Sequence, residues 1–261
     1  MTETNATAPV DMLQITNHGH VMQLEMQLPA PGFISESLNR ALADALDAFD
    51  DDDGCRAVVL SSSGKVFCAG ADLRSAAVGG LPDVPAFYRQ AMRLFRTRKP
   101  IVAAVQGPAV GAGFGLALVA DFRIGSHATR FCANFNRLGV HPGFGMSVTL
   151  PNLVGQQHAA RLFYTGQRMD GEAALRIGLL DELVEHGEVV KRALELAADI
   201  AASAPLSVES TRETLRLGLA DRIMEANQRE LQVQSNQWTT ADFREGVAAM
   251  AGRRLPVFQR C

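Results

Sequence analysis

Two stretches of small residues stand where apolar runs end. Residues 64–73 (GKVFCAGADL) follow the apolar run 57–60, and residues 106–115 (QGPAVGAGFG) follow the apolar run 101–105. Short apolar runs are typical of buried strands, and small residues at a strand exit let a ligand approach the backbone closely. Each exit can direct a backbone N–H at one oxygen, which is how a protein holds an enolate or a tetrahedral oxyanion. A helix that starts near Gly111 would add the positive end of its dipole.

The glycines of these stretches also fit tight turns and close helix packing. Either stretch alone is compatible with both interpretations. The occurrence of two such stretches, each directly after a strand, favours the interpretation as a binding site. The chemistry expected of the pair is stabilisation of a negative charge on a carbonyl oxygen.

Several motifs, in order, resemble the crotonase (enoyl-CoA hydratase/isomerase) superfamily. Residues 67–73 resemble that family's first oxyanion segment, and Gly107 with residues 111–113 resembles the second. Similar segments follow in the family's order at 120–124, 138–140 with 142–143, 242–246 and 253–258. The likeness covers roughly residues 12–258. It implies an α/β fold, a crotonase-like spiral of ββα units with a C-terminal helical trimerisation region, and an acyl-CoA thioester as ligand.

The resemblance also implies which groups hold the thioester. The backbone N–H groups of Ala71 and Ala112 would grip the carbonyl oxygen as an oxyanion hole. The substrate-binding positions implied around them are Cys68, Ala69, Gly70, Asp72, Leu73, Gly111, Gly115, Asn134 and Phe135. Asp72 is expected mainly to brace its loop by accepting backbone hydrogen bonds. Coenzyme A is part of the substrate, so neither a separate cofactor nor a metal is expected.

The sequence departs from the family's hydratases at both catalytic glutamates. Alignment of the motifs puts these two positions on Gly115 and Phe135, and neither residue can carry a proton. A positioned general acid or base contributes about 10²–10⁴-fold. Ordinary hydratase turnover is therefore not expected unless another group substitutes.

His141 is the candidate substitute base. It lies one or two residues before positions where other branches of the superfamily place a catalytic aspartate, and imidazole is the side chain that titrates nearest neutral pH. The alternative is a histidine directed at a helix terminus or a subunit contact. Asn134 and Asn136 are candidates to orient water or a substrate carbonyl. His127 and His158 lie outside any motif and are expected on the surface.

Two functions of different class follow. The first is an acyl-CoA enzyme (hydratase, isomerase, hydrolase or C–C lyase), which His141 favours. The second is an acyl-CoA-binding protein that kept the thioester grip and lost catalysis, which Gly115 and Phe135 favour. Because these two residues replace charged glutamates, we also expect a more hydrophobic and roomier acyl pocket that suits long, branched or cyclic acyl groups.

Composition sets further bounds. With 261 residues and 47% hydrophobic content, the chain is long enough for one sizeable core. A net charge of −3, with only three lysines among 25 basic residues, does not suggest a nucleic-acid surface. The four cysteines lack metal-ligand spacing and the N-terminus lacks a signal-type apolar core, which favours a reduced, cytoplasmic location. No apolar run reaches the ~20 residues that span a bilayer.

Local patterns predict the elements that position the site. Alternation over residues 22–28 predicts a half-buried strand after a turn at 17–20. Ser35 is a candidate N-cap of a helix whose apolar face is Leu38, Leu42, Leu46 and Phe49. The acidic run 50–53 is expected to end that helix as a solvated loop. From residue 57 onward, strand and helix signals alternate, as in stacked βαβ units.

The later chain is predicted to be mainly helical. Asp170 is a candidate cap for a helix over 171–177, and helical spacing recurs over 189–202 and 220–250. The irregular loop 75–85 is a candidate mobile wall beside the acyl group. Residues 1–11 are predicted to form a flexible tail, 12–205 the spiral core, and 206–261 a C-terminal helical region of the same domain unit. In relatives this region packs on a neighbouring subunit, so the resemblance implies a homotrimer or hexamer.

Overall fold

The computed structural model describes residues 12–73 and 83–261 of the chain. Its larger sheet has six strands in the order β1-β2-β3-β4-β6-β9. They are β1 (Leu13–His18), β2 (Val21–Met26), β3 (Ala57–Ser62), β4 (Ile101–Val105), β6 (Phe122–Ser126) and β9 (Glu182–Val184). The first two strands form an antiparallel hairpin, and the other neighbours pair in parallel. The predicted α/β class is confirmed.

A smaller sheet continues the spiral. It orders β5 (Pro108–Val110), β7 (Arg130–Cys132) and β8 (Arg168–Asp170), with β5 and β7 parallel and β7 and β8 antiparallel. An isolated bridge between Cys68 and Ala109 adds the first predicted segment to the edge of this sheet. The two glycine-containing segments are therefore neighbours in space.

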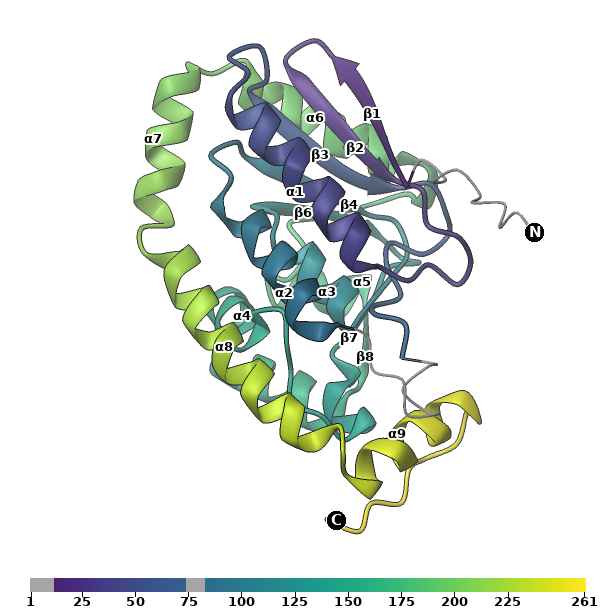
Figure 1. Ribbon diagram of the computed structural model, residues 1–261. Coiled ribbons are helices and arrows are strands. Elements are labelled where there is room, and N and C mark those ends of the chain that lie inside the picture. The colour runs from purple at the N-terminus through teal and green to yellow at the C-terminus, as the bar shows by residue number, and fades with distance from the viewer. Residues whose placement is uncertain (1–11, 74–82) are drawn as a thin grey trace, which may run out of the picture.

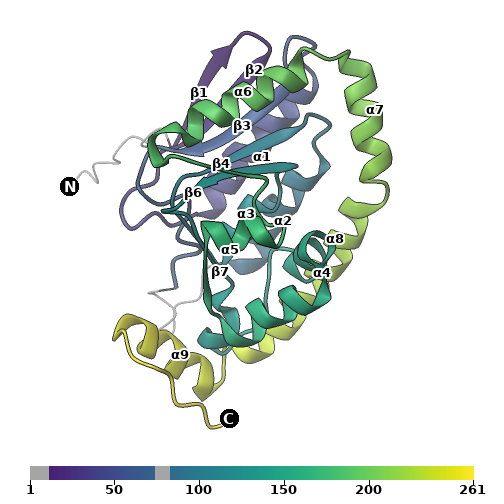
Figure 2. The same cartoon turned by 180° about the vertical axis from the view of Figure 1, so that it is seen from behind.

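Helices cover both faces of the larger sheet. On one face, α1 (Glu36–Asp50) packs with α2 (Val84–Arg93), and on the other face α6 (Val189–Ala201) covers the sheet. Figure 1 shows α1 in front of the strands, and the reverse view in Figure 2 shows α6 in front of them. Strands β3 and β4 are buried along their whole length because both faces are covered.

The N-terminal cap of α1 is confirmed, whereas the acidic run behind the helix differs from expectation. The Leu38 N–H donates to the Ser35 side chain over 3.1 Å, and the four predicted apolar residues are buried. Asp51 and the two residues after it are exposed. Asp50 instead accepts from the Thr97 hydroxyl at 2.8 Å and from the Arg98 N–H at 2.9 Å. The prediction of a wholly solvated acidic loop is therefore wrong at Asp50.

The predicted helix over residues 220–250 is two helices. They are α8 (Leu219–Gln237) and α9 (Ala241–Ala251), and the Thr240 hydroxyl caps the second by accepting from the Phe243 N–H at 3.1 Å. A further helix, α7 (Pro205–Leu215), precedes them. Figure 1 shows α7 and α8 along one side of the molecule and α9 at its lower end.

The remaining helices connect the layers. They are α3 (Ala112–Ala117), α4 (Met146–Thr165) and α5 (Gly171–Arg176), with short 3₁₀ turns at Leu94–Arg96, Asn134–Leu138 and His186–Glu188. Asp170 caps α5 as predicted, since it accepts from the Ala173 N–H at 2.8 Å.

Two predicted segments fall mainly outside the described residues. The tail 1–11 lies there entirely, and so do residues 75–82 of the loop predicted as a mobile wall. The end of that loop belongs to α2, which Asp83 caps by accepting from the Ala86 N–H at 2.9 Å. Among the described residues, we find no helix with the length and apolar character needed to cross a membrane.

Candidate functional site

The first predicted segment lies directly beside the second. The Cys68 N–H donates to the Pro108 carbonyl at 3.1 Å, and the Cys68 carbonyl accepts from the Val110 N–H at 3.0 Å. The approach is close enough to exclude a side chain at Gly113, where a Cβ would lie 2.2 Å from the Cys68 carbonyl oxygen. The glycines therefore allow two strand exits to touch.

Ala71 stands at the end of the first segment. Its partner in an isolated parallel bridge is Ile34, and within this bridge the Ile34 N–H donates to the Gly70 carbonyl at 2.9 Å. The residue opposite a bridging N–H directs its own N–H to the other side. Gly70, at φ +90°, lies close to the second segment: a Cβ there would lie 2.7 Å from the Val110 carbonyl oxygen and 3.5 Å from the Ala112 nitrogen.

Ala112 supplies the second predicted donor. It is the first residue of α3, and the first four N–H groups of a helix have no acceptor within the helix. Gly111, at φ +54°, turns the chain into this helix, and its own N–H donates to the Cys132 carbonyl at 2.9 Å. Because α3 has only six residues, its dipole is small, and the N–H group itself is the main polar contribution.

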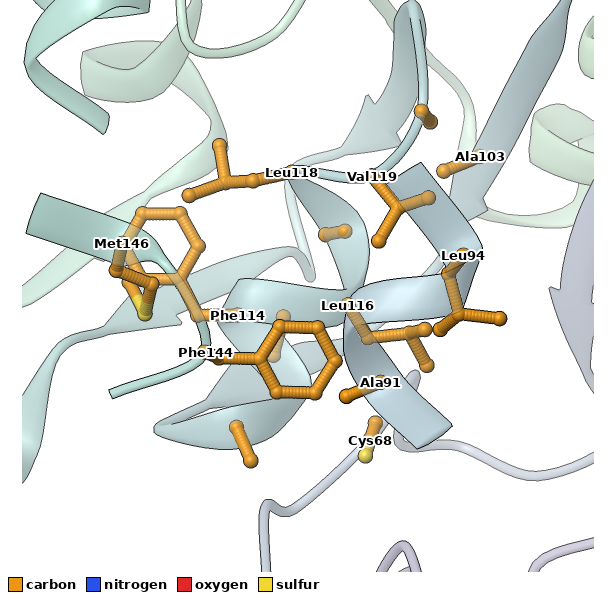
Figure 3. Close-up of a cluster of buried hydrophobic side chains, with 14 of the residues drawn as sticks. Cys68, Ala91, Leu94, Ala103, Phe114, Leu116, Leu118, Val119, Phe144 and Met146 are labelled. Carbon is orange, nitrogen blue, oxygen red and sulfur yellow. The ribbon is translucent and has the colours of Figure 1, made fainter. Parts of the chain in front are cut away.

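The predicted extra space at Gly115 is absent. A Cβ at this position would lie 2.6 Å from both Cβ and Cγ of Phe144. Phe144 is fully buried and makes edge contacts with Phe87 and Phe95, with ring centroids 6.2 and 6.3 Å apart. Figure 3 shows the Phe144 ring beside the α3 residues Phe114 and Leu116. The prediction of a roomier pocket at Gly115 is therefore wrong.

Asn134 and Phe135 both reach Gly111. The Asn134 Oδ1 lies 3.1 Å, and the Phe135 Cζ 4.0 Å, from the position that a Cβ on Gly111 would take. Phe135 is buried, so this part of the site carries an apolar wall. The Asn134 amide also lies 3.8 Å from the Met250 sulfur, which brings α9 to the same place.

The His141 backbone is held by α8. Its N–H donates to the Gln237 side chain, and its carbonyl accepts from the buried Gln234 amide, both at 2.7 Å. The imidazole Nδ1 lies 2.7 Å from the Pro142 carbonyl oxygen and must donate, because a carbonyl only accepts. The neutral ring therefore keeps Nε2 as its acceptor. Within the described part of the chain, no hydrogen bond joins this ring to Ala71 or Ala112, so its catalytic role stays a prediction.

Comparison with known proteins gives the family. The enoyl-CoA hydratase/isomerase family model matches residues 16–260. The chain belongs to this family. A carnitinyl-CoA dehydratase from Salmonella typhi is 31% identical over 258 residues, which cover 95% of this chain and 98% of the relative.

Solved structures of the family agree. An enoyl-CoA hydratase/isomerase from Pseudoalteromonas atlantica T6c has a TM-score of 0.87 and 32% identity, and covers 95% of this chain and 100% of its own. A carnitinyl-CoA hydratase from Mycobacterium avium has a TM-score of 0.85 and 29% identity, and covers 97% and 100%. The expected crotonase-type fold is confirmed, and the chain is a crotonase-family enzyme that processes acyl-CoA.

The other predicted positions of this family site differ in what they can offer a ligand. Ala69, Asp72 and Leu73 are half-buried, and their roles remain predictions. Cys68 is fully buried, and burial raises the pKa of its thiol to about 12. It can therefore offer backbone groups but no thiolate nucleophile. His127 and His158 are exposed, as predicted.

Sequence reasoning missed Glu230 of α8. This buried carboxylate accepts from the Gly145 N–H at 2.8 Å and from the Ser147 N–H at 3.0 Å. It therefore fixes the start of α4, directly after Phe144. Its only sequence signal is a position on the inner face of a helix, which does not reveal the partner.

A cavity beside the site was also missed. It has a volume of about 660 Å³ and lies among β5, β7, Asn134–Leu138 and α9. Four arginines line it, namely Arg130, Arg137, Arg168 and Arg254. They are scattered in the sequence, so only the fold reveals that they share one cavity.

Proposed function

We propose that this enzyme holds the thioester carbonyl of an acyl-CoA between the N–H groups of Ala71 and Ala112. The observation that carries the proposal is the direct contact of the two segments, in which Gly70 approaches the Ala112 nitrogen. Two backbone donors aimed at one oxygen stabilise an enolate or an oxyanion, and removing one such donor elsewhere costs about 10²–10³ in rate. The grip comes from the backbone, so it does not depend on the side chains at these positions.

The proposed reaction does not use the usual pair of carboxylates. Gly115 lacks a side chain and Phe144 fills the space beside it, which supports chemistry without a water held at this position. Isomerisation, thioester hydrolysis, C–C cleavage and hydration assisted by a group other than the two glutamates are the candidate classes. We propose Nε2 of His141 as the base, because Nδ1 is engaged by Pro142.

The second candidate is an acyl-CoA-binding protein without turnover. The filled space at Gly115 and the buried Phe135 favour it, because neither place can carry a proton. The two candidates share the same thioester grip. They differ only in whether a bound thioester is converted.

A panel of acyl-CoAs separates these candidates. Saturated, α,β-unsaturated, β-oxo and carnitinyl thioesters are incubated with the protein, and mass spectrometry follows hydration, double-bond shift, free CoA and chain cleavage. We expect conversion of at least one class. Binding of thioesters that are all returned intact would favour the binding protein, and failure to bind any of them would refute the thioester grip.

Replacement of His141 tests the base. His141→Ala should lower turnover by about 10²–10⁴-fold with little change in affinity, because the carbonyl is held by the backbone. His158→Ala is the matched control, since His158 is exposed. Equal turnover in the two variants would remove His141 from the chemistry.

We also propose a homotrimer or hexamer in the cytoplasm, with coenzyme A as part of the substrate and no separate cofactor. Exposed leucines on and after α7 support subunit contacts, since Leu206, Leu215 and Leu217 are 81%, 82% and 75% exposed in the single chain. Sedimentation velocity gives the mass of the assembly, and a monomer would contradict the proposal.

A further inference from the structure

The cavity of about 660 Å³ has an apolar floor and a charged rim. One wall of the cavity is the face of the smaller sheet that carries Val110 and Cys132. The opposite wall is α9 with residues 254–256. Figures 1 and 2 both show α9 at the end of the molecule next to this sheet. The apolar part of the lining comes from Pro108, Val110, Cys132, Leu138, Met250 and Leu255.

The cavity borders the proposed thioester site. Val110 immediately precedes Gly111, and the Asn134 Oδ1 lies 3.1 Å from the Cβ position of that glycine. Both Val110 and Asn134 also line the cavity. An acyl group that leaves the thioester on this side of Gly111 therefore runs into the cavity.

The charge of the cavity is positive, although the whole chain carries −3. Arg130, Arg137, Arg168 and Arg254 line it, and no carboxylate is among the lining residues that the structure describes. Arg254 is compensated by an ion pair with Glu245. The other three arginines have no carboxylate partner in the described part of the chain.

The hydrogen bonds of these three arginines show which of them has donors left for a ligand. Arg130 and Arg137 donate to backbone carbonyls, including the His127 carbonyl at 2.6 Å and the Thr165 carbonyl at 2.8 Å. Arg168 stands opposite Cys132 in the β7–β8 ladder, and its side chain makes no hydrogen bond or ion pair with the described residues. Its guanidinium therefore has donors available for a ligand.

The carboxylate that stands opposite Arg130 has another partner. Asp170 stands opposite Arg130 in the same ladder, but its side chain caps α5 through the Ala173 N–H at 2.8 Å. A guanidinium with free donors binds a carboxylate through charge-assisted, often bidentate hydrogen bonds. An apolar floor at the same time accommodates methylene groups.

We propose that this cavity binds the distal end of the acyl group and that the preferred ligands are CoA thioesters of dicarboxylic acids. The inference rests on the proposed thioester grip and adds the substrate class. The methylene chain lies on the apolar floor, and the terminal carboxylate pairs with Arg168. A positively charged acyl group is disfavoured by the same arginines.

Calorimetry with two thioesters of equal length tests the preference. Adipyl-CoA and hexanoyl-CoA both have six acyl carbons, and only adipyl-CoA ends in a carboxylate. We expect adipyl-CoA to bind at least about tenfold more tightly, which corresponds to about 1.4 kcal/mol. The preference should shrink as salt screens the charges. If both bind equally well, or hexanoyl-CoA binds better, the inference is overturned while the thioester grip stands.

Arg168→Gln assigns the preference to the cavity. We expect this variant to lose most of the preference through weaker binding of adipyl-CoA, with unchanged affinity for hexanoyl-CoA. Arg176→Gln, which changes an exposed arginine of α5 outside the cavity, should keep the full preference. Circular dichroism checks that both variants fold.

Two further results would be decisive. If Arg168→Gln weakens adipyl-CoA, hexanoyl-CoA and free CoA by one common factor, the arginine binds a phosphate of coenzyme A, and the inference is overturned. If the folded protein binds neither thioester, the proposed function fails first and this inference fails with it.

Discussion

Close backbone contacts at single glycines decide how near the two donor segments come. A Cβ at Gly107 would lie 1.9 Å from the Lys65 carbonyl oxygen, and a Cβ at Gly113 would lie 2.2 Å from that of Cys68. Both values are below any real non-bonded contact, so neither position accepts a side chain without a backbone shift. If the proposed thioester site is right, the same close contacts that pack the two segments also set the position of its two backbone donors.

Gly113→Ala tests whether the close contact of the two segments is needed for ligand binding. The added methyl group forces the segments apart, so we expect a loss of about 1–3 kcal/mol in the free energy of unfolding and a marked loss of acyl-CoA affinity. Urea denaturation and calorimetry measure the two effects. Gly187→Ala is the control, because a Cβ there meets no atom within 4 Å and the residue has no positive φ. Unchanged affinity in Gly113→Ala would separate the close contact from ligand binding.

The residues of the site differ in how far the sequence predicts them. The adjacency of the two segments follows from local patterns, since each stretch of small residues stands behind a buried strand. The filling of the space at Gly115 by Phe144 could not be predicted from local patterns, because it joins residues far apart in the chain. Phe144 also adopts φ +65°, which is rare for a bulky residue and has no sequence signal here.

At the scale of elements, the half-buried carboxylate of Asp121 is one of the groups that hold α7 against the rest of the chain. Asp121 accepts from Arg212 Nε at 2.9 Å and from Arg216 Nη1 at 2.8 Å, and it also accepts from the Ile101 N–H at 2.9 Å. Burial by itself raises the pKa of Asp121, but the two arginines and the backbone N–H outweigh it, and the pKa lies below its usual value. The carboxylate therefore joins the start of β4 to α7.

Asp121→Asn should weaken the attachment of α7 to the start of β4. The amide can still accept from the Ile101 N–H, but it leaves the buried Arg212 without its counter-charge, which costs about 3–5 kcal/mol at pH 7. Because the pKa of Asp121 is lower in the folded state, the stabilisation that its carboxylate gives is fully present above about pH 4. It is lost as the pH falls through the folded-state pKa, so the difference from the parent protein narrows in acid. Thermal denaturation at pH 7 and in steps below pH 4 measures this.

Asp221→Asn is the comparison for that experiment. Asp221 also pairs with an arginine, Arg96, but the side chains are 76% and 51% exposed, so the loss should stay within about 1 kcal/mol. An Asp121→Asn variant as stable as Asp221→Asn would show that α7 does not depend on the Asp121–Arg212 pair.

Elements with local signals are predicted well. Ser35 and Asp170 cap their helices as expected, because an N-cap bonds to a residue only three positions away. The interruption between α8 and α9 was missed although Thr240 is a cap residue, since apolar spacing continues across it. The role of Asp50 could not be predicted, because Thr97 and Arg98 approach it only in the folded chain.

At the scale of the whole molecule, the C-terminal helices share the core of the spiral. Ile223, Phe243 and Val247 belong to the same hydrophobic cluster as Leu24 and Leu60. Polar contacts add to this, since Glu230 holds the start of α4 and the Tyr88 hydroxyl donates to Gln234 at 3.2 Å. This shared core leads us to expect that residues 206–261 unfold together with the rest of the domain in one cooperative transition.

Two probes of unfolding test that expectation. The single tryptophan, Trp238, follows α8 and reports on the C-terminal region, whereas far-ultraviolet circular dichroism reports on the whole chain. Coincident transitions indicate one cooperative unit. Glu230→Ala should then lower both midpoints by the same amount, because the carboxylate joins the two regions. The measurement is repeated at several protein concentrations, because subunit association makes the midpoint depend on concentration. A tryptophan transition at clearly lower urea than the circular dichroism transition would instead define the C-terminal helices as a separate unit.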